Sequence, residues 1–384
     1  MCFHTPHCTV VSVLICQDDG YSFGKSIKSP PRQGNGMARI LVTGFEPFGS
    51  HQRNISSELV ELLPLTLQLN DPWADLRQHA VESIDVTIET RVLSVDEAGS
   101  TEIASALSQG KNWDAILHIG LCESCLIPRI ETLAQDKIDM RIPDNKGRQI
   151  MNQPISGQGD IPVTVPVQSW MARGWPLECE LSIDAGTYIC NETLYRTLSA
   201  LNTISNNNSN ATPCFFLHLP PHEKCPLSSG LELVKELIQR MMYRPVISVV
   251  AALITQNDHY LVARRSLTEK HPGKWEFPGG KVEPNESLNQ ALEREIKEEF
   301  GWGVVCDEPV GTWYHSLKNN DIAIHVLPTS FHGHTPNFDD QELWTAHDAV
   351  ALRSLGDISP LDWLGNDEAV VDWMRETTYL PKAK

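Results

Sequence analysis

The chain has 384 residues, of which 41% are hydrophobic and 21% charged, and it carries a formal net charge of −18. These values are ordinary for a soluble globular protein, and the length predicts two domains or at most three. The negative charge excludes a general nucleic-acid binder, which needs a basic face to neutralise phosphates. The longest apolar run, residues 246–254, is too short to cross a bilayer. We therefore expect a cytoplasmic protein without membrane partners.

The first 36 residues differ in character from the rest of the chain. An apolar patch at 8–16 has no lysine or arginine before it and no small-residue cleavage site after it, so it makes a poor signal peptide. Residues 26–36 are rich in proline, glycine and polar side chains. We expect residues 1–36 to be a disordered extension, or the product of an upstream start codon chosen in error.

After this segment, short apolar runs alternate with amphipathic stretches, which is typical of an α/β sheet. Strands are predicted at 40–44, 87–95, 115–120 and 214–220, and helices at 56–63 and 229–242. Pro245 cannot continue the helix before it, and an apolar strand begins directly afterwards. We therefore expect an N-terminal domain at 37–243, an open α/β sheet with helices on both faces. A second domain is expected at 245–380, and an exposed insertion at 206–210.

The ten cysteines show no disulfide-rich pattern, so reduced thiols are the simpler interpretation. Cys122 and Cys125 form a C-x-x-C pair, but a metal or redox role needs a second ligand pair or an exposed helix start, and the chain contains no second pair. We interpret this pair as a coincidence within a loop.

Two residues of the N-terminal domain have the chemistry of an activated cysteine nucleophile. Cys190 begins an apparent helix after a Gly-Thr-Tyr turn, and the partial positive charge at a helix N-terminus stabilises a thiolate. His218 stands at the end of a strand, where open α/β sheets form their sites. A Cys–His pair also needs a third group that fixes the imidazole tautomer.

The N-terminal domain resembles the pyroglutamyl peptidase I (pyrrolidone-carboxylate peptidase) family. The resemblance covers about residues 38–243 and rests mainly on three segments, 40–56, 130–147 and 184–195. It implies a cysteine peptidase that removes an N-terminal pyroglutamyl residue from peptides and needs no cofactor.

The resemblance also implies a role for individual residues. The Cys190 thiolate would attack the amide after the pyroglutamyl residue, and water would hydrolyse the resulting thioester. His218 would act first as base and then as acid, and Glu131 would orient its imidazole. The two aromatics that match residues sandwiching the lactam ring are Phe45 and Phe48, and Arg141 matches a residue near the catalytic centre.

The chain departs from the family pattern near the expected substrate pocket. The stretch at 120–125 replaces a Gly-rich segment, and Leu121 stands where a glutamine is common. Ser50, Ile55 and Asp136 replace a glycine, a proline and an asparagine. The alternative to an active peptidase is therefore a catalytically silent module that serves binding or oligomerisation.

Clustered acids follow a Gly-Gly turn in the C-terminal domain. Glu295, Glu298 and Glu299 stand at i, i+3 and i+4, so a helix places all three carboxylates on one face. Like charges repel, and a hard divalent cation such as Mg²⁺ resolves the conflict because it prefers carboxylate oxygens. Gly279 and Gly280 let the backbone turn tightly before this helix.

The spacing of these residues matches the Nudix box, so the C-terminal domain resembles the Nudix hydrolases from about 246 to 374. The matching positions are Gly280, Glu286, Arg294, Glu295, Glu298, Glu299 and Gly301. The resemblance implies an α/β/α sandwich with a mixed sheet, and an enzyme that cuts the diphosphate bridge of a nucleotide-type substrate.

The Nudix resemblance implies Mg²⁺, with Mn²⁺ as an alternative, held by Glu295, Glu298 and Glu299. One of these carboxylates would also serve as the base. Arg294 is expected to orient Glu295, and Glu286 to tie the loop to the helix. We expect Gly301 to end the helix as a left-handed cap.

Within the Nudix superfamily, the segment 274–287 resembles the MutT-type nucleoside triphosphate pyrophosphohydrolases. Arg264 matches an arginine that contacts the phosphate or the base of the nucleotide. Asp367 matches a residue that hydrogen-bonds the edge of the base. For both residues, the alternative is an ordinary surface charge. Phe277 either packs near the base or belongs to the core. A further metal-binding acid matches Glu342 or Asp340. The resemblance leaves the nucleotide open between oxidised dGTP, a pyrimidine triphosphate and other dNTPs, and it leaves the oligomeric state open.

Overall fold

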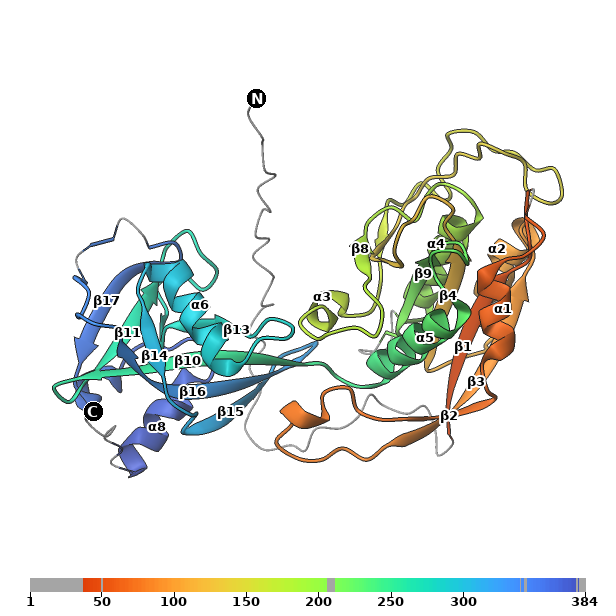
Figure 1. Cartoon of the computed structure of the whole chain (residues 1–384). Helices are drawn as coiled ribbons and strands as arrows, with labels where there is room; N and C mark the ends of the chain where they lie inside the picture. The colour runs from red at the N-terminus through yellow and green to blue at the C-terminus, as the bar shows by residue number, and fades with distance from the viewer. Residues whose placement is uncertain are drawn as a thin grey trace. The chain divides into compact units, whose positions relative to one another are not determined.

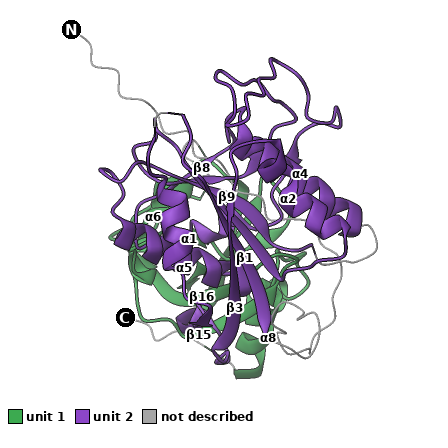
Figure 2. Cartoon of the chain, turned by 90° about the vertical axis from the view of Figure 1, so that its right-hand side faces the viewer, with its two compact units in different colours: residues 1–25, 246–384 green, residues 26–245 purple. Residues whose placement is uncertain are grey.

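The computed structural model describes residues 37–49, 51–205, 211–338, 340–341, 344–377 and 379. The chain forms two compact units and passes from one to the other between Pro245 and Val246 (Figure 2). The predictions for residues 1–36, for 206–210, for Ser50 and for Glu342 lie outside the described residues. Within the described ranges, no helix has the length and apolar character needed to cross a membrane.

The unit that ends at Pro245 is built on a seven-stranded sheet with the order β2-β3-β1-β4-β9-β5-β8 (Figure 1). The central strands β3, β1, β4 and β9 run parallel, whereas β2 and β5 pair antiparallel with β3 and β9. Its strands are β1 (Ala38–Phe45), β2 (Thr66–Leu69), β3 (Ile84–Leu93), β4 (Ala115–Leu121), β5 (Arg129–Glu131), β8 (Glu180–Ser182) and β9 (Cys214–Leu219). A separate two-stranded sheet joins β6 (Leu133–Ala134) and β7 (Ile161–Pro162).

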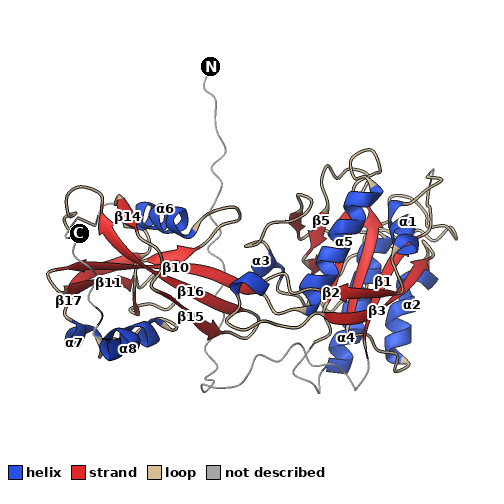
Figure 3. Cartoon of the chain, turned by 60° about the horizontal axis from the view of Figure 1, so that its bottom comes forward, coloured by secondary structure: helices blue, strands red, loops and turns tan. Residues whose placement is uncertain are grey.

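Helices flank this sheet on both faces (Figure 3), as predicted. Leu41 of β1 packs in one core cluster with Ile103 of α2 and Leu198 of α4. Because side chains alternate along a strand, Ile40 and Val42 point to the opposite face, where α1 and α5 pack. The helices are α1 (Ile55–Leu62), α2 (Glu97–Ser108), α3 (Val167–Trp170), α4 (Ile189–Ser205) and α5 (Leu227–Met242), with a 3₁₀ turn at Ala74–Leu76.

A close approach between α1 and β1 depends on Gly44. A Cβ atom at Gly44 would lie 2.6 Å from the carbonyl carbon of Ser56 and 2.7 Å from Cγ2 of Val60. The Ser56 hydroxyl accepts a hydrogen bond from the Phe45 backbone N–H at 2.9 Å, which fixes the end of β1 against the helix. Asn54 caps α1, because its Oδ1 accepts from the Ser56 N–H at 3.1 Å.

The unit that begins at Val246 is a mixed eight-stranded sheet between helices (Figure 1). β10 and β16 pair parallel and form its centre, and the other pairs are antiparallel. The strands are β10 (Val246–Gln256), β11 (His259–Arg265), β12 (Trp275–Glu276), β13 (Gly279–Lys281), β14 (Val304–Cys306), β15 (Gly311–Ser316), β16 (Asp321–Phe331) and β17 (His347–Arg353). The helices are α6 (Leu288–Phe300), α7 (Leu355–Ile358) and α8 (Asp367–Thr377).

The two faces of β10 bury different helices, which confirms the predicted sandwich. Ala252 packs in a cluster with Ile296 of α6, whereas its neighbour Leu253 packs in another cluster with Val371 of α8. A capping box of Ser287 and Gln290 begins α6. Gly301 ends α6 with φ 74°, the left-handed cap that was predicted.

Replacing Gly44 by alanine should lower the thermal unfolding midpoint of the N-terminal unit by roughly 2–10 °C, because the added methyl would push α1 away from β1 and overpack the core. Differential scanning calorimetry of the full chain measures the shift. Gly174→Ala is the matched control, because a Cβ there meets no atom within 4 Å. Equal midpoints for the two variants would contradict the close approach.

Candidate active sites

His218 and Glu131 meet on neighbouring antiparallel strands. Arg129 of β5 pairs with His218 of β9, so Glu131 lies two residues further along β5. Glu131 is fully buried, and its Oε1 accepts a hydrogen bond from His218 Nδ1 at 2.8 Å. A carboxylate at Nδ1 holds the proton on that nitrogen and leaves Nε2 as the nitrogen for a second partner.

The second partner of His218 is the thiol of Cys190. Cys190 is the second residue of α4 and is half-buried, and its side chain hydrogen-bonds with His218. The strand β4 passes below it at Gly120, where a Cβ atom would lie 3.0 Å from Cys190 Sγ and 2.8 Å from the ring of Phe216. A glycine at position 120 therefore leaves room for the sulfur between β4 and α4.

The surroundings of His218 favour its charged form. Burial by itself lowers the pKa of His218, but the hydrogen bonds to Cys190 and Glu131 outweigh it and raise this pKa to about 9. The imidazole therefore stays protonated at neutral pH. A protonated imidazole beside a sulfur at a helix N-terminus stabilises a thiolate. The three residues that the sequence predicted as a catalytic group thus lie in one hydrogen-bonded chain.

An apolar pocket opens onto Cys190. Phe45 and Phe48, predicted to contact the substrate, line it together with the nucleophile. Tyr188 also lines it, with its ring 6.2 Å from that of Phe48. The sequence analysis missed Tyr188, although its position two residues before Cys190 was a signal. The remaining lining residues are Asn54, Val95, Leu121 and Ile189.

Other residues predicted near this site lie at different places. Arg141 is exposed on the loop after β6 and is not among the residues that line the pocket. Ile55 is buried as the first residue of α1. Asp136 accepts hydrogen bonds from the Ser156 and Gly159 backbone N–H groups at 2.7 and 2.9 Å, so it organises a loop.

A buried ion-pair network, which was not predicted from the sequence, links α4 to the loop between β6 and β7. Glu192 is almost fully buried one turn into α4 and pairs with Arg148 Nη2 at 2.6 Å. Arg148 Nε also pairs with Asp144 at 3.0 Å. Burial raises the pKa of Glu192, but bonds to Arg148 and Arg196 outweigh it, so the pKa is lowered and the carboxylate stays charged.

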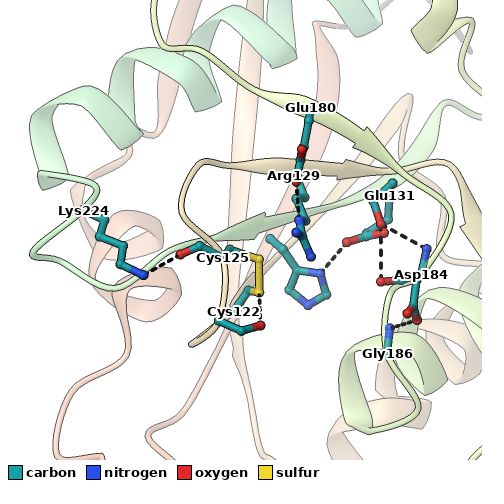
Figure 4. Close-up of a disulfide and its surroundings, with 11 residues drawn as sticks. Cys122, Cys125, Arg129, Glu131, Glu180, Asp184, Gly186 and Lys224 are labelled. Carbon is teal, nitrogen blue, oxygen red and sulfur yellow. Dashed lines mark hydrogen bonds and ion pairs between the residues drawn. A yellow bond between two sulfur atoms is a disulfide. The ribbon is translucent and has the colours of Figure 1, made fainter. Parts of the chain in front are cut away.

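The interpretation of Cys122 and Cys125 was wrong, because the structure joins them in a disulfide (Figure 4). A four-residue turn brings their Cα atoms to 5.4 Å, and the Cys125 N–H donates to the Cys122 carbonyl at 3.3 Å. The C-x-x-C spacing contains no information on this turn geometry. The expectation of reduced thiols is therefore wrong for this pair. The other cysteines among the described residues form no disulfide, and they are Cys179, Cys190, Cys214, Cys225 and Cys306.

In the second unit, Arg294 organises the predicted acidic residues. It forms a two-pronged ion pair with Glu286, with Nε and Nη2 at 2.9 and 3.0 Å from the two carboxylate oxygens. Its Nη1 reaches Glu295 at 3.0 Å and Glu298 at 3.2 Å, and its Nη2 donates to the Lys281 carbonyl at 2.9 Å. The pKa of Arg294 is raised, mainly by Glu286. Arg294 thus holds Glu295, and Glu286 ties the loop to α6.

The Gly-Gly turn makes room for the first carboxylate. A Cβ atom at Gly280 would lie 2.5 Å from Glu295 Oε1, so the acid packs directly against the bare backbone. Gly279 has φ 158°, and a side chain there would collide with the backbone of Val250. Both glycines are therefore required by the packing of β13 between α6 and β10.

Two of the three predicted metal ligands are turned inward. Burial raises the pKa of Glu295, and burial with the neighbouring Glu276 raises the pKa of Glu299 far above its usual range. Glu299 Oε2 is buried and accepts no hydrogen bond, whereas the side chain of Glu298 is 61% exposed. Across the described ranges, no three His, Cys, Asp or Glu side chains converge on one metal position. The unpartnered buried oxygen and the crowded carboxylates fit a divalent cation in their donor chemistry.

A histidine that the sequence analysis missed borders this acidic group. His347, the first residue of β17, pairs in register with Arg265 of β11. Its Nε2 bonds Glu276 at 2.7 Å, its Nδ1 lies 3.9 Å from Glu299 Oε2, and its ring stacks on Phe300 at 4.8 Å. Only the long-range pairing of β11 with β17 places it here, so no local pattern could have predicted it.

The residues predicted to read the nucleotide fall into different environments. Arg264 pairs with Asp348 at 2.8 Å and is 41% exposed. Phe277 is buried and stacks on Trp363 at 5.1 Å within the core. Asp367 is buried, so the surface-charge interpretation of it was wrong, and its Oδ2 accepts from the Phe277 N–H at 2.9 Å. Burial raises the pKa of Asp367 to about 8. Asp340 is exposed.

Comparisons with known proteins support the family resemblance of each unit. A family model described as pyroglutamyl peptidase matches residues 38–225, and one described as NUDIX domain matches residues 244–374. NUDIX domains generally use divalent metals, and the two domains together indicate a hydrolytic enzyme with cysteine-peptidase and nucleotide-type hydrolase parts.

Individual relatives match the first unit. The pyrrolidone-carboxylate peptidase of Deinococcus radiodurans is 28% identical over 198 residues, which cover 50% of this chain and 82% of that protein. The same enzyme of Yersinia pestis is 30% identical over 190 residues, which cover 48% and 79%. The crystal structure of pyrrolidone carboxyl peptidase from Thermus thermophilus has 31% identity and a TM-score of 0.42, covering 52% of this chain and 99% of that one. This chain belongs to the pyroglutamyl peptidase family through its N-terminal unit, and its C-terminal unit is a NUDIX domain.

Proposed function

We propose that the segment 37–243 is an active peptidase that removes N-terminal pyroglutamate. The hydrogen-bonded chain from Cys190 through His218 to the buried Glu131 supports this proposal, because it opens onto an apolar pocket walled by two phenylalanines. The lactam ring of pyroglutamate is flat and largely apolar, so Phe45 and Phe48 would hold it on either side. A catalytically silent module would not need a hydrogen-bonded cysteine, histidine and glutamate beside a pocket.

In this mechanism the Cys190 thiolate attacks the carbonyl carbon of the pyroglutamyl residue. His218 gives its Nε2 proton to the leaving amine, and a thioester between the enzyme and the pyroglutamyl group remains. The neutral imidazole then takes a proton from water, which hydrolyses the thioester and restores the thiolate–imidazolium pair. Glu131 keeps the Nδ1 proton in place throughout, so only Nε2 exchanges protons with the reacting groups.

We further propose that the segment 245–380 is a Mg²⁺-dependent pyrophosphohydrolase of nucleoside triphosphates, with Mn²⁺ as an alternative metal. When bound, the metal would stabilise the charge that develops on the phosphate oxygens. Glu295, Glu298 and Glu299 would hold it, and one of them would take the proton of the attacking water. Arg294 keeps Glu295 against the Gly-Gly turn. The unpartnered buried oxygen of Glu299 is the observation that supports this proposal.

Asp367 is the proposed contact to the nucleobase. A carboxyl group with a pKa of about 8 keeps its proton at neutral pH, so it offers one donor and one acceptor to a base edge. Arg264, already paired with Asp348, would contact a phosphate or the base on the exposed side of the sheet. The buried Phe277 would support Asp367 through its backbone N–H, rather than stack on the base.

Removal of the nucleophile gives the first test of the peptidase. Cys190→Ala should lower the release of coumarin from pyroglutamyl-7-amido-4-methylcoumarin by at least roughly 1,000-fold, because only binding remains. Cys306→Ala, which removes a buried cysteine of the other unit, should keep wild-type turnover. Wild-type release no greater than that of Cys190→Ala would favour the silent module.

The pH dependence gives a second test. Because its bonds to Cys190 and Glu131 raise the pKa of His218 from 6.5 to about 9, the charge that these bonds favour on the imidazole is fully present below pH 6.5 and is lost as the pH rises through 9. We expect kcat/KM to fall on the alkaline side near pH 9. Glu131→Gln should move this limb to lower pH, because it weakens the bond that raises the pKa. Glu180→Gln, which removes only the ion pair with Arg129, should leave the limb in place.

Metal-dependent turnover tests the second unit. In a screen of nucleoside triphosphates with excess Mg²⁺, Glu298→Gln and Glu299→Gln should each lower product release by roughly 100- to 1,000-fold, because each removes a charge that binds the metal. Glu293→Gln is the control, since Glu293 lies exposed on the same helix. Chromatography distinguishes pyrophosphate and monophosphate from single phosphate release. The assignment is refuted if the wild-type protein releases no phosphate product from any of the triphosphates.

A further inference from the structure

The disulfide of Cys122 and Cys125 lies in a connection that reaches the peptidase site at both ends. This connection, residues 121–131, leads from the end of β4 to the end of β5. Its first residue, Leu121, lines the pocket beside Cys190. Its last residue, Glu131, holds His218. A change in the conformation of this connection can therefore reach the substrate pocket without altering any catalytic side chain.

The turn closed by the disulfide also contacts the aromatic wall of the pocket. Glu123, at the tip of the turn, forms an ion pair with His51. The His51 ring lies 5.6 Å from the ring of Phe48, which lines the same pocket as Leu121. The disulfide turn therefore holds two parts of the pocket, one through the backbone at Leu121 and one through Glu123 and His51.

The remaining bonds of the turn are few. The Cys122 N–H donates to the Leu219 carbonyl at 2.8 Å. Figure 4 shows the second bond, in which Lys224 Nζ donates to the Cys125 carbonyl at 3.1 Å. Between these two anchors, Glu123 and Ser124 are exposed. Cleavage of the sulfur–sulfur bond would remove the covalent link across this short stretch and leave it to hydrogen bonds and the partly exposed Glu123–His51 ion pair.

The far end of the connection is held independently. Glu131 belongs to β5, which pairs with β8 on one side and with β9 on the other. Arg129 adds an ion pair to Glu180 at 2.5 Å across the β5–β8 pair (Figure 4). Loosening of the turn at 122–125 therefore leaves the Glu131–His218 bond in place.

The two sulfurs differ in their access to solvent. Cys122 is half-buried beside the exposed tip of the turn, whereas Cys125 is fully buried. An external thiolate can approach the sulfur of Cys122 but not that of Cys125. The other cysteines of the described chain are not bonded in disulfides, and burial raises the pKa of Cys179 to about 12.

We propose that Cys122 and Cys125 form a redox site that reacts with small thiol reductants and sets the affinity of the peptidase pocket for its substrate. This inference rests on the proposed peptidase function. In the oxidised form the turn holds Leu121 and the loop that carries Phe48 in place, and the pocket binds the lactam ring tightly. In the reduced form both walls loosen and the substrate binds more weakly, while the catalytic chain stays intact.

The exchange is a two-electron reduction of the disulfide by two thiol equivalents. The thiolate of a dithiol such as dithiothreitol attacks Sγ of Cys122, the sulfur–sulfur bond breaks, and Cys125 leaves as a thiolate that takes a proton. The second thiol of the reductant then attacks its own mixed-disulfide sulfur and releases Cys122, which is protonated in turn. The reductant ends as its cyclic disulfide, and the protein has gained two electrons and two protons.

The test compares the wild type with Cys122→Ser/Cys125→Ser in buffers of fixed ratios of reduced to oxidised dithiothreitol. Maleimide labelling and mass spectrometry of the 122–125 peptide report the redox state. Steady-state kinetics with the pyroglutamyl coumarin substrate then give KM and kcat separately. Effects on the Cys190 thiol appear equally in both proteins, so the double variant isolates the contribution of the disulfide.

We expect reduction to raise the KM of the wild type by roughly tenfold, the loss of about one apolar contact in a pocket, with kcat unchanged. The double variant should show the higher KM in every buffer. An equal KM for oxidised and reduced wild type overturns the proposal. Complete labelling of Cys122 and Cys125 in the most oxidising buffer also overturns it.

Hydrogen–deuterium exchange in the same buffers gives a measurement that does not depend on turnover. Reduction should speed exchange in the backbone of segments 46–52 and 119–126 in the wild type and should have no effect on the double variant. Unchanged exchange overturns the proposal even if the peptidase is active. If Cys190→Ala and wild type show equal turnover while exchange still responds to reduction, the proposed peptidase function fails and the redox-sensitive turn stands.

Discussion

The chemistry of both units depends on carboxylates that are removed from water and must find a counter-charge. In the N-terminal unit two buried acids have one: Glu131 bonds the imidazole of His218 through Oε1 while its Oε2 accepts no hydrogen bond, and Glu192 bonds the guanidinium of Arg148. In the C-terminal unit Arg294 compensates Glu286 and Glu295, but Glu299 keeps an oxygen without a partner. A buried charge without compensation costs several kcal/mol. The difference between the two sites supports the proposal that a cation completes the second one.

How far the sequence predicts these sites depends on how local their geometry is. The individual acidic residues of the α6 site could be predicted, because helical spacing alone puts Glu295 and Glu299 on one face. His347 could not, because a strand pairing between residues far apart in sequence brings it to Glu276. Four strands and two helices of the N-terminal unit were predicted from alternating apolar runs, whereas β2, β5, β8 and α2 were not. The antiparallel insertion of β5 beside β9, which places Glu131 against His218, followed from no local pattern and was reached only through the family resemblance.

The errors of interpretation have a common physical origin. A C-x-x-C spacing is compatible with a loop, a metal site or a disulfide, and only the turn at Cys122 decides between them. Asp367 begins a helix in a polar stretch of sequence, which is typical of a surface cap, yet the packing of α8 buries its carboxyl group next to the backbone of Phe277. In both cases residues distant in sequence determine the environment. Burial and pairing, rather than residue type, decide whether a polar side chain is structural or reactive.

The two kinds of cysteine in the N-terminal unit place opposite demands on the redox environment. In the proposed peptidase the nucleophile must be reduced, whereas the disulfide that is proposed to hold the pocket must be oxidised. These demands are compatible because Cys122 and Cys125 are bonded to each other, so neither sulfur is free to bond with Cys190. Both oxidations need an external oxidant, but oxidised Cys190 would end as a sulfenic acid or a mixed disulfide with another molecule, whereas the two cysteines of the turn bond to each other within four residues. An intramolecular bond between neighbours forms under milder conditions than any intermolecular one, because the effective concentration of the second thiol is high. A range of conditions therefore exists in which the turn is closed and the nucleophile is still a thiolate, and in that range the pocket and the catalytic chain are complete together.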